Sequence, residues 1–319
     1  LKFFYEQKEE TEHRIYHDTE RYRKAFAKIK VVDSDKNPVD NVKVSVKQIE
    51  HEYKFGCNIF MLDEFPDEEH NQKYREIFPK LFNYAIVPFY WSDFELTDGN
   101  PRIGENVEKV YRRPSAHKVV KYCMENNIKM KGHPLFWHHF LPDWLVQDKD
   151  EAMFRLDKRL REIANGYADD IRDWDTVNES LSRPRHKDDK RLPEDHVYKT
   201  FKKAEKYFTN NRLFINETTM VWDNYIKEMS GYFMQIENLL SRGIQIDGIG
   251  LQYHLFCKEE NFIKDTEFTL NPECLFNVLD TYAKFQKPLH VSEITVPAYG
   301  GTEEWKEAQA EMAELLYRL

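Results

Sequence analysis

Residues 174–179 (WDTVNE) form a short run that ends at Glu179 and follows a helix-like segment. A second run, residues 290–293 (HVSE), ends in the same way at Glu293. Side chains at the carboxyl ends of the strands of an α/β barrel converge on one mouth, where the chemistry of such proteins takes place. Enough residues separate the two glutamates for several strand–helix units to lie between them. We therefore predict a barrel whose mouth carries both carboxylates.

A pair of carboxylates on different strands supplies the two groups that hydrolysis of a glycosidic bond requires. One carboxyl group donates a proton to the leaving oxygen, and the other attacks the sugar or activates a water molecule. A buried glutamate at a strand end can also be a structural ion-pair partner, and for Glu179 taken alone the two interpretations are equally good. The pair of glutamates indicates a glycosidase.

The rest of the chain alternates short apolar runs with amphipathic segments, which is the pattern of a parallel sheet with helical connections. We predict strands at residues 55–60, 83–87, 128–133, 174–179, 212–216, 248–252 and 289–292. We predict helices at residues 115–126, 150–171, 194–208, 222–236, 272–285 and 303–319. In the second helix Met153, Leu156, Leu160, Ile163 and Tyr167 share one face, so it should pack against the sheet.

This order predicts an α/β fold, a (β/α)8 TIM barrel. Seven strand–helix units can be counted, whereas the closed barrel has eight. An open barrel would leave an unpaired strand edge and an exposed core, which is costly. We therefore expect the sequence to be truncated at the C-terminus of the barrel, or the eighth strand to come from elsewhere.

The first 52 residues predict an extension that precedes the barrel. Residues 1–23 are rich in Glu, Lys and Arg, which predicts a solvated helix. Residues 26–32 and 39–49 predict two antiparallel strands, and residues 33–38 (DSDKNP) between them are rich in turn formers. We predict a helix and a small β-hairpin in residues 1–52, beside a catalytic barrel in residues 53–319.

Composition limits the partners and the chemistry. The formal net charge of −9 argues against nucleic acid or an anionic membrane as a partner, and it is compatible with a neutral polymer. No apolar run reaches the length of a transmembrane helix. The four cysteines form no CxxC pair, and the chain has no HExxH motif, so we expect free thiols, no metal and no cofactor.

Two longer motifs carry a family resemblance. Residues 132–144 (GHPLFWHHFLPDW) and 174–181 (WDTVNESL) together resemble glycoside hydrolase family 10, the endo-β-1,4-xylanases. Residues 246–255 (IDGIGLQYHL) and 91–99 (WSDFELTDG) are similar to further motifs of that family, more weakly. The resemblance spans roughly residues 55–319, and it places the catalytic interpretation of Glu179 well above the structural one.

The resemblance implies a retaining double displacement, in which the two carboxyl groups lie about 5–5.5 Å apart. Glu179 would be the acid/base and Glu293 the nucleophile, while Asn178 would hold the hydroxyl group beside the reacting carbon. An acid has to stay protonated, so we expect apolar or anionic neighbours to raise the pKa of Glu179. The subsite of the sugar under attack would be lined by His133, Trp137, Gln252 and His254. Of these, His254 would hold Glu293 ionised, and Trp137 would stack on the apolar face of a pyranose.

The chain departs from the family pattern at two places. The family carries a Glu-Asn pair and a lysine at the end of its second strand, where residues 86–90 of this chain are IVPFY. We therefore expect sugar binding at this strand to be more aromatic and less polar. Thr295 stands where the family has an aspartate two residues after the nucleophile, so the support of His254 should differ.

The resemblance implies a secreted or periplasmic endo-1,4-β-xylanase that acts on xylan or arabinoxylan, although no signal peptide is visible in the sequence. Two alternatives stay open. One is a glycosidase of the same clan that acts on another β-glycan, which the changed second strand would favour. The other is a carbohydrate-binding barrel that does not hydrolyse its ligand, which the missing eighth strand would favour.

Overall fold

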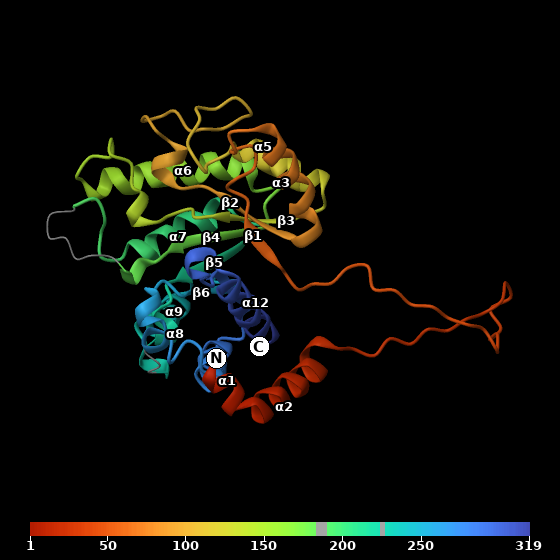
Figure 1. The fold of residues 1–319 in the computed structure, drawn as a ribbon. Coiled ribbons are helices and arrows are strands. Elements are labelled where there is room, and N and C mark those ends of the chain that lie inside the picture. Colours follow the sequence, from red (N-terminus) through yellow and green to blue (C-terminus); the bar gives the residue numbers. More distant parts are fainter. Residues whose placement is uncertain (183–189, 224–226) are drawn as a thin grey trace.

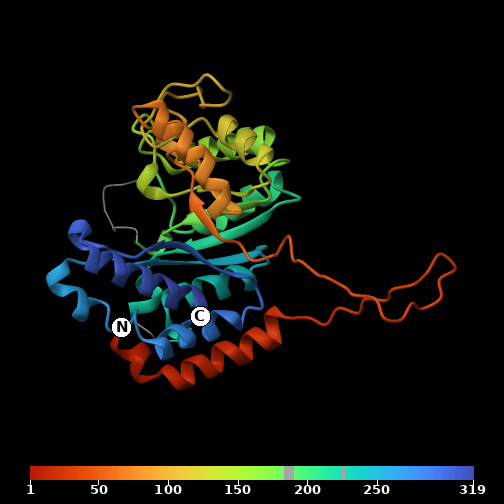
Figure 2. The same cartoon turned by 45° about the vertical axis from the view of Figure 1, so that its right-hand side comes forward.

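A computed structural model describes residues 1–182, 190–223 and 227–319. Its centre is a sheet of seven parallel strands that lie side by side in chain order and curl into part of a barrel (Figures 1 and 2). The strands are β1 (Gly56–Asn58), β2 (Tyr84–Pro88), β3 (Lys129–His133), β4 (Asp173–Asn178), β5 (Arg212–Glu217), β6 (Gly248–His254) and β7 (Leu289–Thr295). Every strand lies at a predicted position, so the predicted order of strands is confirmed.

Helices connect each strand to the next, which gives the (β/α)8 TIM-barrel fold that the sequence predicts. They are α3 (Glu68–Leu81), α4 (Trp91–Phe94), α5 (Ala116–Glu125), α6 (Lys149–Tyr167), α7 (His196–Tyr207), α8 (Met220–Asp223), α9 (Gly231–Ser241), α10 (Phe262–Asp265), α11 (Pro272–Ala283) and α12 (Glu303–Arg318). Among the described residues the sheet has seven strands, and β1 and β7 are its two edges.

The register of the sheet determines which side chains meet. Asn178 at the end of β4 lies opposite Asn216 of β5, and Gln252 of β6 lies opposite Glu293 of β7. Because neighbouring parallel strands end at the same edge, these four residues gather at the carboxyl end of the sheet. The five residues that predicted the apolar face of α6 are buried.

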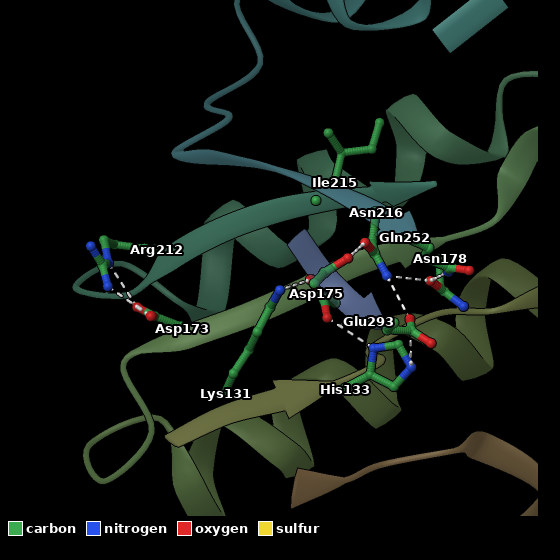
Figure 3. Close-up of polar contacts among 12 residues, drawn as sticks. Lys131, His133, Asp173, Asp175, Asn178, Arg212, Ile215, Asn216, Gln252 and Glu293 are labelled. Carbon is green, nitrogen blue, oxygen red and sulfur yellow. Dashed lines mark hydrogen bonds and ion pairs between the residues drawn. The ribbon is translucent and has the colours of Figure 1, made fainter. Parts of the chain in front are cut away.

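Charged residues lie inside the barrel as well. Lys131 of β3 is 1% exposed, and its Nζ lies 2.5 Å from Oδ1 of Asp175 on β4. Nearer the amino ends of the strands, Arg212 Nη2 lies 2.7 Å from Oδ2 of Asp173, and both pairs are drawn in Figure 3. Buried ionised groups require partners, and the carboxylates of Asp173 and Asp175 each have a cationic partner here.

The helix predicted at residues 222–236 is interrupted in the structure. It is divided into α8, a short 3-10 turn at Lys227–Met229, and α9. Ser230 adopts an extended backbone conformation, and its Oγ accepts a hydrogen bond from Phe233 N (3.1 Å), so α9 has its own N-cap and starts afresh. Ile226, which helped to predict one continuous helix, lies outside the described residues. Helix α3 was not predicted from the sequence. Asp67 caps this helix, because its side chain accepts a hydrogen bond from His70 N (3.0 Å).

The N-terminal segment begins with α1 (Lys2–Glu6), α2 (Lys8–Asp18) and a π-helical turn at Thr19–Arg23. The predicted turn at residues 33–38 is closed by one antiparallel bridge between Val32 and Pro38. Apart from this bridge, residues 24–55 form no β-strand and extend away from the barrel (Figures 1 and 2). The alternating Val42, Val44 and Val46 are 45%, 50% and 74% exposed, so they have no apolar surface on which to order a strand.

Two further findings concern the chain as a whole. No helix in the described ranges is long and apolar enough to cross a membrane. The four cysteines are free, as expected from their spacing.

Candidate active site

The predicted site residues converge at the carboxyl end of the sheet. His133 is the last residue of β3, and Glu179 directly follows β4. Gln252 and His254 lie at the end of β6, and Glu293 lies in β7. Residues from four strands therefore surround one place at the mouth of the barrel, although they are far apart in the sequence.

Three side-chain amides, those of Gln252, Asn178 and Asn216, connect the two glutamates. Gln252 Nε2 donates hydrogen bonds to Glu179 Oε1 (3.0 Å) and to Asn178 Oδ1 (3.2 Å). Asn216 Nδ2 donates to the same Asn178 oxygen (2.8 Å) and to Glu293 Oε1 (2.9 Å). Figure 3 shows Asn216 between Asn178 and Glu293. The positions of the two carboxylates are thus coupled through a continuous set of hydrogen bonds across four strands.

Glu293 is held in its ionised form. Its Oε2 lies 3.3 Å from His254 Nε2, and its Oε1 lies 4.0 Å from His133 Nε2. Burial by itself would raise the pKa of Glu293, but the hydrogen bond with His254 and the nearby His133 outweigh it, so the pKa lies below the ordinary glutamate value. A carboxylate that stays ionised in an enclosed place is suited to attack an electrophilic carbon.

Glu179 shows the opposite behaviour. Burial raises its pKa, the hydrogen bond from Gln252 opposes this shift, and the negative charge of Glu293 adds to it. The net pKa lies above the ordinary value, as the sequence analysis expected from apolar or anionic neighbours. Two carboxyl groups whose surroundings move their pKa values in opposite directions have the division of labour of an acid and a nucleophile.

The backbone of Glu179 is in the left-handed region, with φ = +50°. This conformation costs about 1–2 kcal/mol for a residue with a side chain, so surrounding contacts have to maintain it. Glu179 N donates to Asn216 O (2.9 Å), and Ser182 Oγ donates to Glu179 O (2.8 Å). Both backbone groups of Glu179 are therefore fixed by their neighbours.

His133 is oriented from behind by Asp175. Its Nδ1 lies 2.8 Å from Asp175 Oδ2, while the other oxygen of Asp175 pairs with Lys131 (Figure 3). Because an ionised carboxylate only accepts hydrogen bonds, Nδ1 of His133 is the donor. The opposite nitrogen, Nε2, consequently faces Glu293.

The imidazole of His254 has a neutral hydrogen-bond partner. Its Nδ1 lies 2.8 Å from Thr295 Oγ1, and its ring stacks on Phe256 with centroids 4.5 Å apart. The sequence analysis expected the support of His254 to differ from the family pattern at this residue. The structure shows a hydroxyl group, which can donate or accept, at the back of the imidazole.

An aromatic wall lies beside His133. Tyr90, two residues beyond the end of β2, has its ring centroid 5.6 Å from that of His133, 6.0 Å from Trp137 and 4.6 Å from Phe140. The guanidinium group of Arg113 lies 3.9 Å from the Tyr90 centroid. Trp137 and Phe140 are partly exposed, so the wall offers rings to a ligand at the end of β2.

Within the predicted site, two buried N–H donors have no acceptor among the described residues. They are Nδ2 of Asn178, a residue that is 1% exposed, and Nε1 of Trp137. A buried donor without a partner costs about 1–3 kcal/mol, so a ligand hydroxyl that accepted from it would bind favourably. His133, Trp137, Asn178, Gln252 and His254 can therefore present both polar atoms and rings to a sugar.

Asn216, Glu217 and Tyr90 were not predicted as site residues. Glu217 ends β5, is 2% exposed and has a pKa that burial raises to about 7. The sequence does contain a pattern that could have indicated Glu217, because residues 216–217 repeat the Asn-Glu pair of residues 178–179 at the end of the next strand. In the described part of the chain, no group of three or more His, Cys, Asp or Glu side chains is arranged to hold a metal ion.

The sequence of the chain matches the model of one protein family. Residues 69–318 match the family model described as Glycosyl hydrolase family 10. A "Beta-1,4-xylanase" of Dictyoglomus thermophilum is 29% identical over 188 residues, which cover 57% of this chain and 50% of that protein. An "Endo-1,4-beta-xylanase A" of Caldicellulosiruptor saccharolyticus is 25% identical over 243 residues, which cover 71% of this chain and 64% of that protein. The matched part of the chain spans half to two thirds of the length of these relatives.

Solved structures support the fold. Xylanase 10B of Thermotoga petrophila RKU-1, in complex with xylobiose, superposes with a TM-score of 0.60 at 21% sequence identity. The superposition covers 83% of this chain and 76% of that one. The likeness shows a shared barrel, in agreement with the seven-strand sheet.

Proposed function

The chain belongs to glycosyl hydrolase family 10, as its motifs predicted, and we propose on this basis that it is an endo-1,4-β-xylanase. The substrate would be xylan or arabinoxylan, cut within the polymer with retention of configuration. Relatives of 25% and 29% identity carry xylanase names, which supports this substrate class. We propose secretion or a periplasmic location as well, on the strength of the family resemblance alone.

The two glutamates divide the reaction into two steps. In the first, Glu179 donates its proton to the glycosidic oxygen while the Glu293 carboxylate attacks the anomeric carbon, forming a glycosyl ester and releasing the leaving chain. In the second, the Glu179 carboxylate takes a proton from water, and the water oxygen displaces Glu293. We predict a separation of about 5–5.5 Å between the carboxyl groups, which suits this mechanism.

The other site residues would hold the sugar that is attacked. Asn178 Nδ2 has no acceptor among the described residues, so it is available to the hydroxyl group beside the reacting carbon. Gln252, His133 and His254 would lie around the same ring, and Trp137 would stack on its apolar face.

The observation that carries this proposal is that the pKa values of two carboxyl groups, linked through amide side chains, are shifted in opposite directions. Surroundings that raise the pKa of Glu179 and lower that of Glu293 suit the starting state of a retaining glycosidase, in which the acid is protonated and the nucleophile ionised. The aromatic wall at β2 favours one alternative, hydrolysis of another β-glycan, because a ring surface selects less by hydroxyl pattern than polar groups do.

A direct test incubates the protein with arabinoxylan and, separately, with cellulose, and measures the release of reducing sugar. Proton NMR of the first products identifies their anomer, and Glu179→Gln and Glu293→Gln serve as inactive controls. Cleavage of arabinoxylan with the β-anomer formed first supports the proposal. Cleavage of cellulose alone would select the other-glycan alternative, and binding of xylan without turnover would select a binding protein.

A further inference from the structure

Glu217 occupies a place that the two-step mechanism does not use. Its carboxyl group lies at the end of β5, and its Oε1 accepts hydrogen bonds from Leu181 N (2.9 Å) and Ser180 Oγ (3.0 Å). Its Oε2 accepts from Thr218 N (3.2 Å). Ser180 and Leu181 are the two residues that directly follow Glu179, so one buried carboxyl group holds the segment that leaves the candidate acid/base.

The contacts of Glu217 complete those that hold Glu179 in the left-handed conformation. Asn216, the residue before Glu217, receives the Glu179 N–H at its backbone oxygen. The end of β5 therefore binds the backbone on both sides of the Glu179 side chain. A strained residue persists only where its surroundings determine it, and loss of the Glu217 contacts would release the C-terminal side.

We propose that Glu217 is a positioning residue for Glu179, acting through Ser180 and Leu181; this inference rests on the acid/base role proposed above. Glu217 does not touch the substrate in this scheme. It determines the direction in which the Glu179 carboxyl group points, and with it the efficiency of proton donation to the leaving oxygen.

The charge of Glu217 fits this role. The titratable groups that act on it are Glu179, Tyr232 of α9 and Tyr282 of α11, and both tyrosines stay neutral because their pKa values are raised. Burial raises the pKa of Glu217 to about 7, the hydrogen bonds it accepts oppose this shift, and the charge of Glu179 adds to it. Below neutral pH Glu217 is therefore mostly uncharged and adds no negative charge beside Glu179.

The leaving group offers a readout for positioning. A sugar leaving group requires a proton in the transition state, whereas dinitrophenolate leaves without one, so only the first depends on the geometry of the acid. A variant with a misplaced Glu179 should cleave xylotetraose slowly and still transfer the glycosyl group from dinitrophenyl β-xylobioside. A variant that is only less stable should lose both activities together.

The experiment compares kcat/KM for both substrates in wild type, Glu217→Ala and Glu217→Gln. We expect Glu217→Ala to lose about tenfold or more on xylotetraose and less than about threefold on the aryl substrate, within the range of general acid catalysis. Glu217→Gln keeps an acceptor oxygen for Ser180 and Leu181, so it should recover most of the loss. Glu237→Ala, at an exposed position on α9, is the matched control and should behave as wild type. Equal losses on both substrates, or none, would overturn the inference.

Two further measurements decide the remaining cases. Ser180→Ala removes one donor to Glu217, so it should lower kcat/KM more on xylotetraose than on the aryl substrate, with a smaller loss than Glu217→Ala. Equal effects on both substrates contradict the proposal, and this variant decides the matter even if Glu217→Ala does not fold. If the wild type cleaves neither substrate, the proposed function fails, and a carbon-13 NMR titration of Glu217 takes over. The midpoint should fall from about 7 when Glu179 is replaced by glutamine, because a neighbouring negative charge is removed. An unchanged midpoint would mean that the two groups do not interact.

Discussion

Replacement of Lys131 by methionine tests the buried charge pair behind the site. Methionine preserves most of the volume, so the main change is that Asp175 loses its ammonium partner, which lies 2.5 Å away. Breaking a buried ion pair by removing one partner costs about 3–5 kcal/mol. Because His133 also forms a hydrogen bond with Asp175 and remains in place, we expect the free energy of unfolding to fall by about 3 kcal/mol at pH 7, the lower end of this range. Urea unfolding monitored by circular dichroism measures this difference in the free energy of unfolding.

The pH dependence of the same variant provides a second check. In the wild type, burial would raise the pKa of Asp175, but Lys131 and His133 hold it below its ordinary value. A carboxylate with a lowered folded-state pKa contributes stability above the unfolded pKa, about 3.9, and loses this contribution as the pH falls through the folded pKa. Without Lys131 the pKa of Asp175 rises, so the deficit of the variant should be largest at neutral pH and shrink as the pH approaches 4.

Two controls separate the charge pair from other effects. Lys129→Met changes an exposed lysine on the same strand and should alter stability by less than about 0.5 kcal/mol. Lys131→Met combined with Asp175→Asn removes both charges, keeps an acceptor for His133 and should recover part of the loss. If Lys131→Met is within 1 kcal/mol of the wild type at pH 7, the reasoning about the buried pair is refuted.

Three further predictions concern activity on xylo-oligosaccharides. A pH profile of kcat/KM should be bell-shaped, because Glu293 must be ionised and Glu179 protonated; its acid limb should lie below, and its alkaline limb above, the ordinary glutamate pKa. A profile with both limbs below that value would contradict the assignment. Thr295→Val removes the hydroxyl group that contacts His254 Nδ1, so kcat/KM should fall about fivefold, which corresponds to one hydrogen bond of about 1 kcal/mol. The acid limb of the profile should also move to higher pH. A lower activity with an unmoved limb would indicate a packing effect instead. Tyr90→Ala should raise KM by about threefold to tenfold with a smaller change in kcat, because a ring contact is worth about 0.5–1.5 kcal/mol; an unchanged KM would place the sugar elsewhere.

The strands were predictable because each is a short apolar run between helical segments, and the same pattern located β3 through β7 within a few residues. The helix predicted at residues 222–236 is divided because Ser230 caps α9. The spacing of the apolar residues predicted one continuous helix and does not reveal this local hydrogen bond. The predicted strands at residues 26–32 and 39–49 had the right alternation, but alternation forms a strand only where one face can be buried.

The site was predictable in part. Motif residues such as Asn178 and Glu293 lie where the strands end, and their convergence follows from the barrel. Asn216 could not be predicted in this way, because its role follows from a register that sets it opposite Asn178, and one sequence does not contain the register of two distant strands. Tyr90 was not predicted as a site residue for a related reason, since its ring contacts His133 only because β2 and β3 pair.

The hydrogen bonds through Asn178, Asn216 and Gln252 tie both catalytic candidates to adjacent strands of the sheet rather than to separate loops. We therefore expect the two glutamates to keep their relative position on heating as long as the sheet stays intact. We expect the temperature at which activity is lost to coincide with the melting temperature, without a folded but inactive state below it. Any gain in thermal stability of the sheet should then raise the temperature limit of the proposed activity by the same number of degrees.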